Sequence, residues 1–563
     1  MVASTTMLSH RSAFIVSFVL VALCYVNSLP NEFVFDDRPI VGSNPAVRAI
    51  SPIQFLKSPY WANQQYEGIY RPFTIFSLSV DYAIWQQWAP GFRLTNLAVH
   101  AVNGFLVFVL TSSLVGAGIV PVAAMVLYLI HPVHSEAVTG IIGRSDLFAT
   151  CFLLSAWLLF RRGHTFLPAG LFFLALLSKE NAIVLPGILL LDCLWGRYAP
   201  PDRRGTLEVR KADAAFRIAV IASTAVGYLI LRFSVLGGFG IPASAQYMGG
   251  QLTYIERLMT SGRVFLEYFR LLFFPLNLAG DYDFNAIPIA NVSNWDAWLG
   301  LCLVAGALLS ALFVRRRYWL VSFGVLFAFM VFLPVSNWIT PISVLMAERF
   351  LYLPMIGLSM AAAVIFGGIH DRRLQRLVGI GVLVLATVLC NSHDYIRRND
   401  FTFFGNMVRV EPNSAKARLG YGYALLQAGF REDAARQFEA GLRIIPDFPE
   451  LLTTLAMTKM TLTDCSQAWS LLNRALEIDP GHADTHRRMG DCYMKEGKYR
   501  EAESMYRHAV QSIPYPDSML YFMWGRTLED TGQKESAISA YERAALIDPK
   551  NVFIKQKLNA LRP

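Results

Sequence analysis

Charge is scarce in this chain. Of its 563 residues, 16% are charged, whereas 54% are hydrophobic and 13% aromatic. Such a composition is too apolar for an ordinary soluble protein and indicates a polytopic membrane protein. The long apolar segments stop near residue 393, and the remainder is charged and amphipathic. We therefore divide the chain into a multi-pass membrane domain, residues 1–393, and a polar part, residues 394–563.

Cysteine is also scarce, and no CxxC motif occurs among the seven cysteines. This excludes a disulfide framework. Two cysteines, Cys465 and Cys492, lie in the polar part and could pair if that part faces an oxidising compartment, but their spacing alone does not bring them together. The other five lie in apolar segments, where cysteine is a small buried hydrophobe: Cys24, Cys151, Cys193, Cys302 and Cys390.

The first apolar run, residues 12–29, lacks a basic leader and a small-residue cleavage site before Pro30, so we expect a retained anchor. Residues 401–563 carry 21 Lys and Arg against 20 Asp and Glu, so the basic excess belongs to the membrane loops and indicates topology, not nucleic-acid binding. Basic clusters at 161–162, 197–211, 315–317 and 372–376 should be cytoplasmic. With a cytoplasmic N-terminus, about eleven transmembrane helices place the polar part outside.

That count requires residues 252–278 not to span the membrane. Charged residues recur through this stretch as on an amphipathic helix, which predicts an interfacial or re-entrant segment. The first external loop, residues 30–92, then faces the same compartment as the polar part.

The polar part contains an internal repeat. Pro412, Pro446, Pro480 and Pro514 are each 34 residues apart, the period of tetratricopeptide repeats. Small residues recur at the helix crossing, and an aromatic or Leu recurs where a large side chain should pack into the next repeat. We predict an all-α chain in which an α-solenoid with flanking cap segments follows the membrane domain, with repeats at 415–448, 449–482, 483–516 and 518–551.

Ionisable side chains gather at the external ends of apolar segments. The adjacent Asp36 and Asp37, taken alone, favour a solvated turn or a helix cap. Gathered at one interface with cations, they suit a site that handles a lipid-linked phosphate, because Arg and Lys neutralise phosphate and a carboxylate can act as a general base. The candidates are Asp36, Asp37, Tyr70, Arg71, His131, His134, Glu136, Arg144, Lys179, Glu180 and Arg349.

The order of motifs resembles a known family. An acidic pair after the first span is followed by YRPF at 70–73, HPVHSEAVTGIIGRSD at 131–146, SKEN at 178–181, ERFLYLP at 348–354 and then repeats. This order is similar to that of the transmembrane and tetratricopeptide repeat-containing O-mannosyltransferases, which are themselves distantly similar to protein O-mannosyltransferases. The chain has fewer repeats than the animal members.

The resemblance implies a GT-C glycosyltransferase fold, a polyprenyl or dolichyl phosphate mannose donor, and transfer to Ser or Thr hydroxyls of proteins on the non-cytoplasmic side. It implies Asp36 as the base and Asp37 as its partner, with the reverse order open. The lipid phosphate would be held first by Arg144 and Lys179, then by Arg71 and Arg349. The remaining residues would shape the site: His131, His134, Glu136, Glu180 and Tyr70.

Several alternatives stand beside this interpretation. His131, His134 and Glu136 could cap a helix end, Lys179 with Glu180 could be an interfacial ion pair, and Arg71 and Arg349 could be interfacial anchors. We expect no metal cofactor, although two Asp, two His and a Glu could hold a divalent ion.

At the level of function, the chain could transfer another lipid-linked sugar to a protein, glycan or lipid, or be an inactive scaffold whose repeats recruit partners. The 39 Arg against 11 Lys favour a bacterial inner membrane with periplasmic repeats, and the alternative is an endoplasmic reticulum membrane with luminal repeats.

Overall fold

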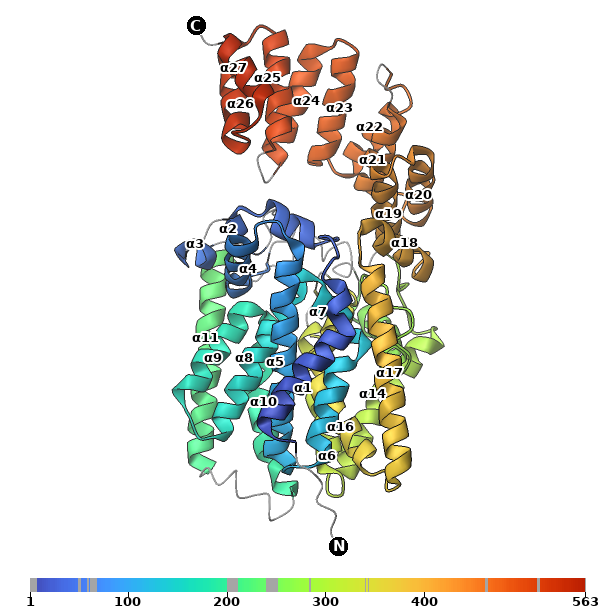
Figure 1. Cartoon of the computed structure of the whole chain (residues 1–563). Coiled ribbons are helices and arrows are strands. Elements are labelled where there is room, and N and C mark those ends of the chain that lie inside the picture. Colours follow the sequence, from blue (N-terminus) through green and yellow to red (C-terminus); the bar gives the residue numbers. More distant parts are fainter. Residues whose placement is uncertain are drawn as a thin grey trace. The chain divides into compact units, whose positions relative to one another are not determined.

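The computed structural model describes residues 8–48, 52–57, 60, 68–199, 211–238, 252–282, 285–339, 341–342, 344–460, 464–513 and 517–561. Over these residues the chain is helical and contains no β-strand, so the predicted all-α class is confirmed (Figure 1). Apart from a short stretch near residue 285, the first compact unit runs to Asn406 and the second begins at Met407.

The first unit is a bundle of mostly apolar helices, joined by short helical turns at one end. Its helices are α1 (His10–Tyr25), α2 (Pro45–Arg48), α3 (Pro52–Lys57), α4 (Pro72–Trp85), α5 (Ala89–Val115), α6 (Ile119–Ile130), α7 (Ser135–Thr139), α8 (Arg144–Arg161), α9 (Phe166–Ser178), α10 (Leu185–Trp195), α11 (Lys211–Leu236), α13 (Tyr254–Phe273), α14 (Trp295–Val314), α15 (Trp319–Phe332), α16 (Pro354–Gly367) and α17 (Arg372–Ile396). Helix α18 (Asp400–Val410) follows.

Six helical segments of the described chain are long and apolar enough to cross a membrane: His10–Ser28, Ala89–Val115, Ile141–Arg161, Asp213–Leu236, Trp295–Val314 and Arg372–Ile396. A seventh candidate joins α6 to Pro132–Thr139 through a 51° bend, and α9, α15 and α16 are shorter apolar helices. These segments support a membrane protein, while the number eleven stays a prediction.

Helix α13 carries the amphipathic stretch and is absent from the candidate spans of the described chain. Thr253 and Glu256 close its N-terminus as a capping box, each bonding the backbone of the other. Its charged side chains form ion pairs: Arg263 lies 2.7 Å from Asp296 of α14, and Arg270 contacts Glu267. A charged face satisfied in this way is compatible with an interfacial helix, and that placement stays a prediction.

The second unit is a series of antiparallel helix pairs. The four pairs are α19 (Ala415–Gln427) with α20 (Arg431–Ile444), α21 (Pro449–Lys459) with α22 (Trp469–Ile478), α23 (Ala483–Lys495) with α24 (Tyr499–Ser512), and α25 (Ser518–Asp530) with α26 (Lys534–Ile547). Helix α27 (Val552–Leu561) closes the stack. Pro514, one of the residues that define the period, lies outside the described residues.

The small and large positions of the repeat meet within each pair. A Cβ atom added to Gly422 would lie 2.2 Å from the ring of Phe438, and one added to Gly490 would lie 2.8 Å from that of Tyr506. Phe438 also shares a core with Leu451 and Leu455 of the next pair. The glycine therefore makes room for the aromatic, which packs in its own repeat as well as in the next one.

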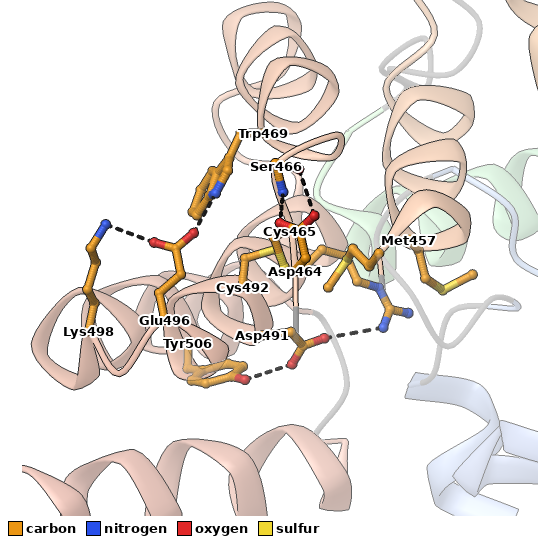
Figure 2. Close-up of a disulfide and its surroundings, with 12 residues drawn as sticks. Met457, Asp464, Cys465, Ser466, Trp469, Asp491, Cys492, Glu496, Lys498 and Tyr506 are labelled. Carbon is orange, nitrogen blue, oxygen red and sulfur yellow. Dashed lines mark hydrogen bonds and ion pairs between the residues drawn. A yellow bond between two sulfur atoms is a disulfide. The ribbon is translucent and has the colours of Figure 1, made fainter. Parts of the chain in front are cut away.

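Cys465 and Cys492 form a disulfide between the second and third pairs (Figure 2). Helix α22 begins only at Trp469, four residues later than the period sets, and Cys465 lies in the turn before it. Trp469 also donates its indole N–H to Glu496, next to Lys498. The disulfide thus anchors a helix start that lacks its regular first turn.

We expect the double variant Cys465→Ser/Cys492→Ser to lower the stability of the repeats by about 2–4 kcal/mol, because the bridge closes a loop across two repeats. Proteolysis of the full-length protein within residues 415–561 should become faster. Cys302→Ser, in α14, is the control and should leave proteolysis unchanged. Equal alkylation of Cys465 and Cys492 before and after reduction would show that the bridge does not form.

Candidate functional site

The acidic pair lies in a tight turn just after the first apolar helix. Phe35, directly before the pair, has φ of +55°, a left-handed conformation that is unusual for an aromatic residue. The Phe35 N–H donates to Asp400 at 3.1 Å, and Arg38 pairs with the other oxygen of Asp400 at 3.0 Å. The Phe35 ring packs against Phe403. Contacts from the start of α18 therefore hold a strained turn in place, as is common at functional sites.

The two carboxylates have different surroundings. Asp37 is 3% exposed, accepts the N–H of Ile142 at 3.2 Å and lies 4.0 Å from Arg93. Burial raises the pKa of Asp37, and Arg93 offsets only part of this effect. Asp36 is half-buried. The more accessible carboxylate is thus Asp36.

Both carboxylates line a small hollow that is open to solvent. Its wall combines segments that are distant in sequence: the turn of the acidic pair, the α7 region, the loop after α13, the turn before α16 and the end of α17. The polar side chains in this wall are Asp36, Asp37, Glu136, Arg349 and Arg397. Of the candidate residues from the sequence, the structure brings four together here, namely Asp36, Asp37, Glu136 and Arg349.

Arg349 and Glu136 face each other across this hollow. The backbone N–H of Arg349 donates to Glu136 at 2.8 Å, and the two side chains form an ion pair. The side chain of Arg349 is 20% exposed, and Arg349 lines the hollow.

Arg144 and Lys179 do not line the hollow. Arg144 is fully buried, lies 2.5 Å from Asp81 and donates to Asn96 at 2.9 Å. Lys179 is 2% exposed and lies 2.6 Å from Asp146. Their cationic groups are therefore occupied by side chains of the protein, which the sequence could not show because Asp81 lies 63 positions before Arg144.

The other candidates also have internal partners. Arg71 makes two hydrogen bonds to Glu180, at 2.6 and 2.9 Å. Tyr70 is buried and donates to the carbonyl of Leu56 at 2.9 Å. His131 caps the turn after α6 by accepting the N–H of Val133. These residues are not part of the lining of the hollow.

His134 is fully buried among the rings of His100, Tyr128 and Tyr352. Within the described residues neither of its ring nitrogens has a hydrogen-bond partner. No group of three or more His, Cys, Asp or Glu is placed to hold a metal ion in that same part of the chain.

Glu348 borders a second hollow, of about 240 Å³, which shares Gly280 and Arg397 with the first. Its carboxyl accepts the Tyr282 hydroxyl at 2.8 Å and the N–H of Ala279 at 2.9 Å. Burial and the nearby Glu136 raise the pKa of Glu348 from its ordinary 4.5 to about 7. A carboxyl in this range is partly protonated near neutral pH.

Three residues near the acidic turn were not among the candidates chosen from the sequence: Arg397 lines the hollow, Arg93 lies beside Asp37, and Asp400 holds the turn. Arg397 and Asp400 follow the last apolar segment directly, as Asp36 follows the first. That parallel position is the signal that could have found them.

Because the pKa of Glu348 is raised, the folded protein favours the protonated form of this carboxyl. The resulting contribution to the free energy of unfolding is fully present below about pH 4.5 and is lost as the pH rises through about 7. Glu348→Gln should match the wild type near pH 5 and exceed it at pH 8 by on the order of 2 kcal/mol. Thermal unfolding of the purified protein across this range measures the difference. The exposed Glu477→Gln is the control, and parallel curves for Glu348→Gln and the wild type would contradict the prediction.

Comparisons with known proteins agree with the resemblance drawn from the motifs. Tetratricopeptide repeat families match residues 463–517 and 520–551. Protein O-mannosyl-transferase TMTC3 of Mus musculus is 24% identical over 94% of this chain and 63% of its own length. Protein O-mannosyl-transferase TMTC4 of Homo sapiens is 26% identical over 74% of this chain and 64% of its own length. The chain therefore spans less than two thirds of these relatives.

A solved structure, MamA 41-end from Desulfovibrio magneticus RS-1, is 24% identical over 26% of this chain and 82% of that chain, with a TM-score of 0.24. The polar part carries tetratricopeptide repeats, and most of the chain is similar to protein O-mannosyl-transferases.

Proposed function

We propose that the protein is a membrane glycosyltransferase that moves mannose from a polyprenyl or dolichyl phosphate to Ser or Thr hydroxyls of proteins on the non-cytoplasmic side. The observation that carries the proposal is the hollow in which the accessible Asp36 lies beside the buried Asp37, with Arg349 in the same wall. The names of the relatives supply the sugar and the acceptor class.

Asp36 acts as the general base. It takes the proton of the acceptor hydroxyl while the hydroxyl oxygen bonds to the anomeric carbon of the sugar. The bond from that carbon to the phosphate oxygen breaks, and its electron pair leaves with the lipid phosphate. Because phosphate leaves as a stable anion, no general acid is needed, in contrast to glycoside hydrolysis. Asp37, held by the Ile142 N–H, fixes the turn and is positioned to bind the sugar.

The cations divide into two groups. Arg349 is the ligand of the donor phosphate among the residues chosen from the sequence, because part of its side chain reaches the hollow. Arg144 and Lys179 hold the helices that carry the site, since a buried, fully paired cation cannot also neutralise a substrate without breaking its ion pair. Arg71 does the same through Glu180.

The hollow and the repeats belong to the non-cytoplasmic side. The acidic turn follows the first span, Arg397 follows the last one, and both line one hollow. A disulfide in the repeats fits an oxidising compartment such as the periplasm or the endoplasmic reticulum lumen. The composition favours a bacterial inner membrane. The repeats capture the acceptor or a partner protein there, as curved helical arrays do.

Asp36→Asn should lower the turnover number for transfer from a polyprenyl phosphate mannose to a Ser/Thr peptide by about 10²–10⁴-fold, because the amide cannot take the proton. The measurement uses purified full-length protein with radiolabelled sugar. Glu32→Gln, whose side chain is 64% exposed, is the matched control and should keep wild-type turnover. Unchanged turnover in Asp36→Asn would show that Asp36 is not the base, whereas absence of transfer in the wild type as well would favour the scaffold function.

Transfer should survive treatment with EDTA, because the donor phosphate is neutralised by arginine. The same assay measures this, with untreated enzyme as the control. Loss of transfer that Mg²⁺ or Mn²⁺ restores would establish a metal in the site and overturn this assignment.

A further inference from the structure

Arg397 differs from the other cations around the hollow. Its guanidinium lies 5.0 Å from the centre of the Phe403 ring, and within the described chain it has no hydrogen bond or ion pair from its side chain. It is half-buried and lines both hollows. An arginine kept near two cavities without a carboxylate partner has all its N–H donors available for a ligand.

The surrounding cations are occupied. Ion pairs with carboxylates engage Arg71, Arg144, Lys179 and Arg349. Arg93, 4.0 Å from Asp37, donates to backbone carbonyls, including that of Thr139 at 3.1 Å. Protein groups thus engage each of these cations directly. Arg397 acts electrostatically on Asp37 and Glu348, but within the described residues its side chain forms no ion pair with either of them.

The backbone leaves room for this guanidinium. A Cβ atom added to Gly280, where φ is +81°, would lie 2.9 Å from Nη2 of Arg397, and one added to Gly140 would lie 3.6 Å from Nη1. The guanidinium group of Arg397 lies between two glycines and the Phe403 ring. These contacts hold the guanidinium in place and leave its N–H groups free to donate hydrogen bonds to a ligand. Such an arrangement is preorganised to bind an oxyanion.

We propose that Arg397 binds the phosphate of the lipid-linked donor, with Arg349 as the second cation of the same phosphate site. The assignment rests on the proposed function for the identity of the donor. The phosphate lies where both hollows meet, next to the acidic turn, and its charge replaces the partner that Arg397 lacks. Glu348 lines the second hollow together with Arg397, and its raised pKa limits repulsion of that phosphate.

The first measurement is the KM for a short-chain polyprenyl phosphate mannose in purified full-length protein. Arg397→Ala should raise this KM by about 10-fold or more, the effect expected for a lost charge-assisted hydrogen bond. The KM for the acceptor peptide should not change. The donor KM of Arg397→Lys should lie between those of the wild type and Arg397→Ala, because lysine keeps the positive charge but lacks the planar set of N–H donors of the guanidinium. Arg398→Ala, at the exposed neighbouring position, is the matched control.

The second measurement uses polyprenyl phosphate without sugar and needs no turnover. It should raise the thermal unfolding temperature of the wild type, Asp36→Asn and Arg398→Ala, but not that of Arg397→Ala. Unliganded Arg397→Ala should unfold near the wild-type temperature, which separates lost binding from lost folding. If mannose transfer fails in every protein while this pattern holds, the proposed function falls and the phosphate site stands.

Three results would overturn the proposal. One is a donor KM in Arg397→Ala equal to that of the wild type. Another is an equal increase in Arg398→Ala, which would indicate a general surface charge effect. The third is equal stabilisation by inorganic phosphate at the same concentration, which would show that the site does not select a lipid-linked phosphate.

Discussion

A charged side chain removed from water needs a partner of opposite charge, and this requirement organises the site end of the first unit. Four buried or half-buried cations there lie against carboxylates from other segments: Arg144 on Asp81, Lys179 on Asp146, Arg71 on Glu180 and Arg349 on Glu136. Because each pair joins helices that are separate in sequence, breaking one would leave an uncompensated charge in the interior. Of the four pairs, that of Arg349 with Glu136 lies in the lining of the hollow.

The acidic turn depends on this framework from the opposite side. Phe35 holds a positive φ that costs about 1–3 kcal/mol for a residue with a bulky side chain. Asp400 supplies the compensation by accepting the Phe35 N–H and pairing with Arg38. The segment after the last apolar helix thus fixes the segment after the first, and the site cannot form from the N-terminal half alone.

The sequence predicts what depends on local pattern and order. The described helix pairs α19 to α26 follow the 34-residue period, and six apolar helical segments of the described chain are long enough to cross a membrane. The motif order brought Asp36, Asp37, Glu136 and Arg349 to one hollow. The sequence pattern could not predict which charged side chains form ion pairs with each other.

Arg144 illustrates this limit. Its motif is the same whether the guanidinium faces a substrate or Asp81, and only the fold decides between the two. The disulfide could not be predicted for a related reason. Two cysteines 27 residues apart have no defined distance until the repeats are stacked.

The unequal burial of the two aspartates favours one of the two orders that the motif leaves open. Two adjacent carboxylates disfavour each other's negative charge, so the environment of each decides which of the two is more easily protonated. Burial raises the pKa of Asp37, while Asp36 is the less buried of the two. A base has to be accessible and charged before the reaction, whereas a positioning group has to be fixed. Asp37, held between the Ile142 N–H and Arg93, meets the second condition, which supports the proposal that Asp36 takes the proton.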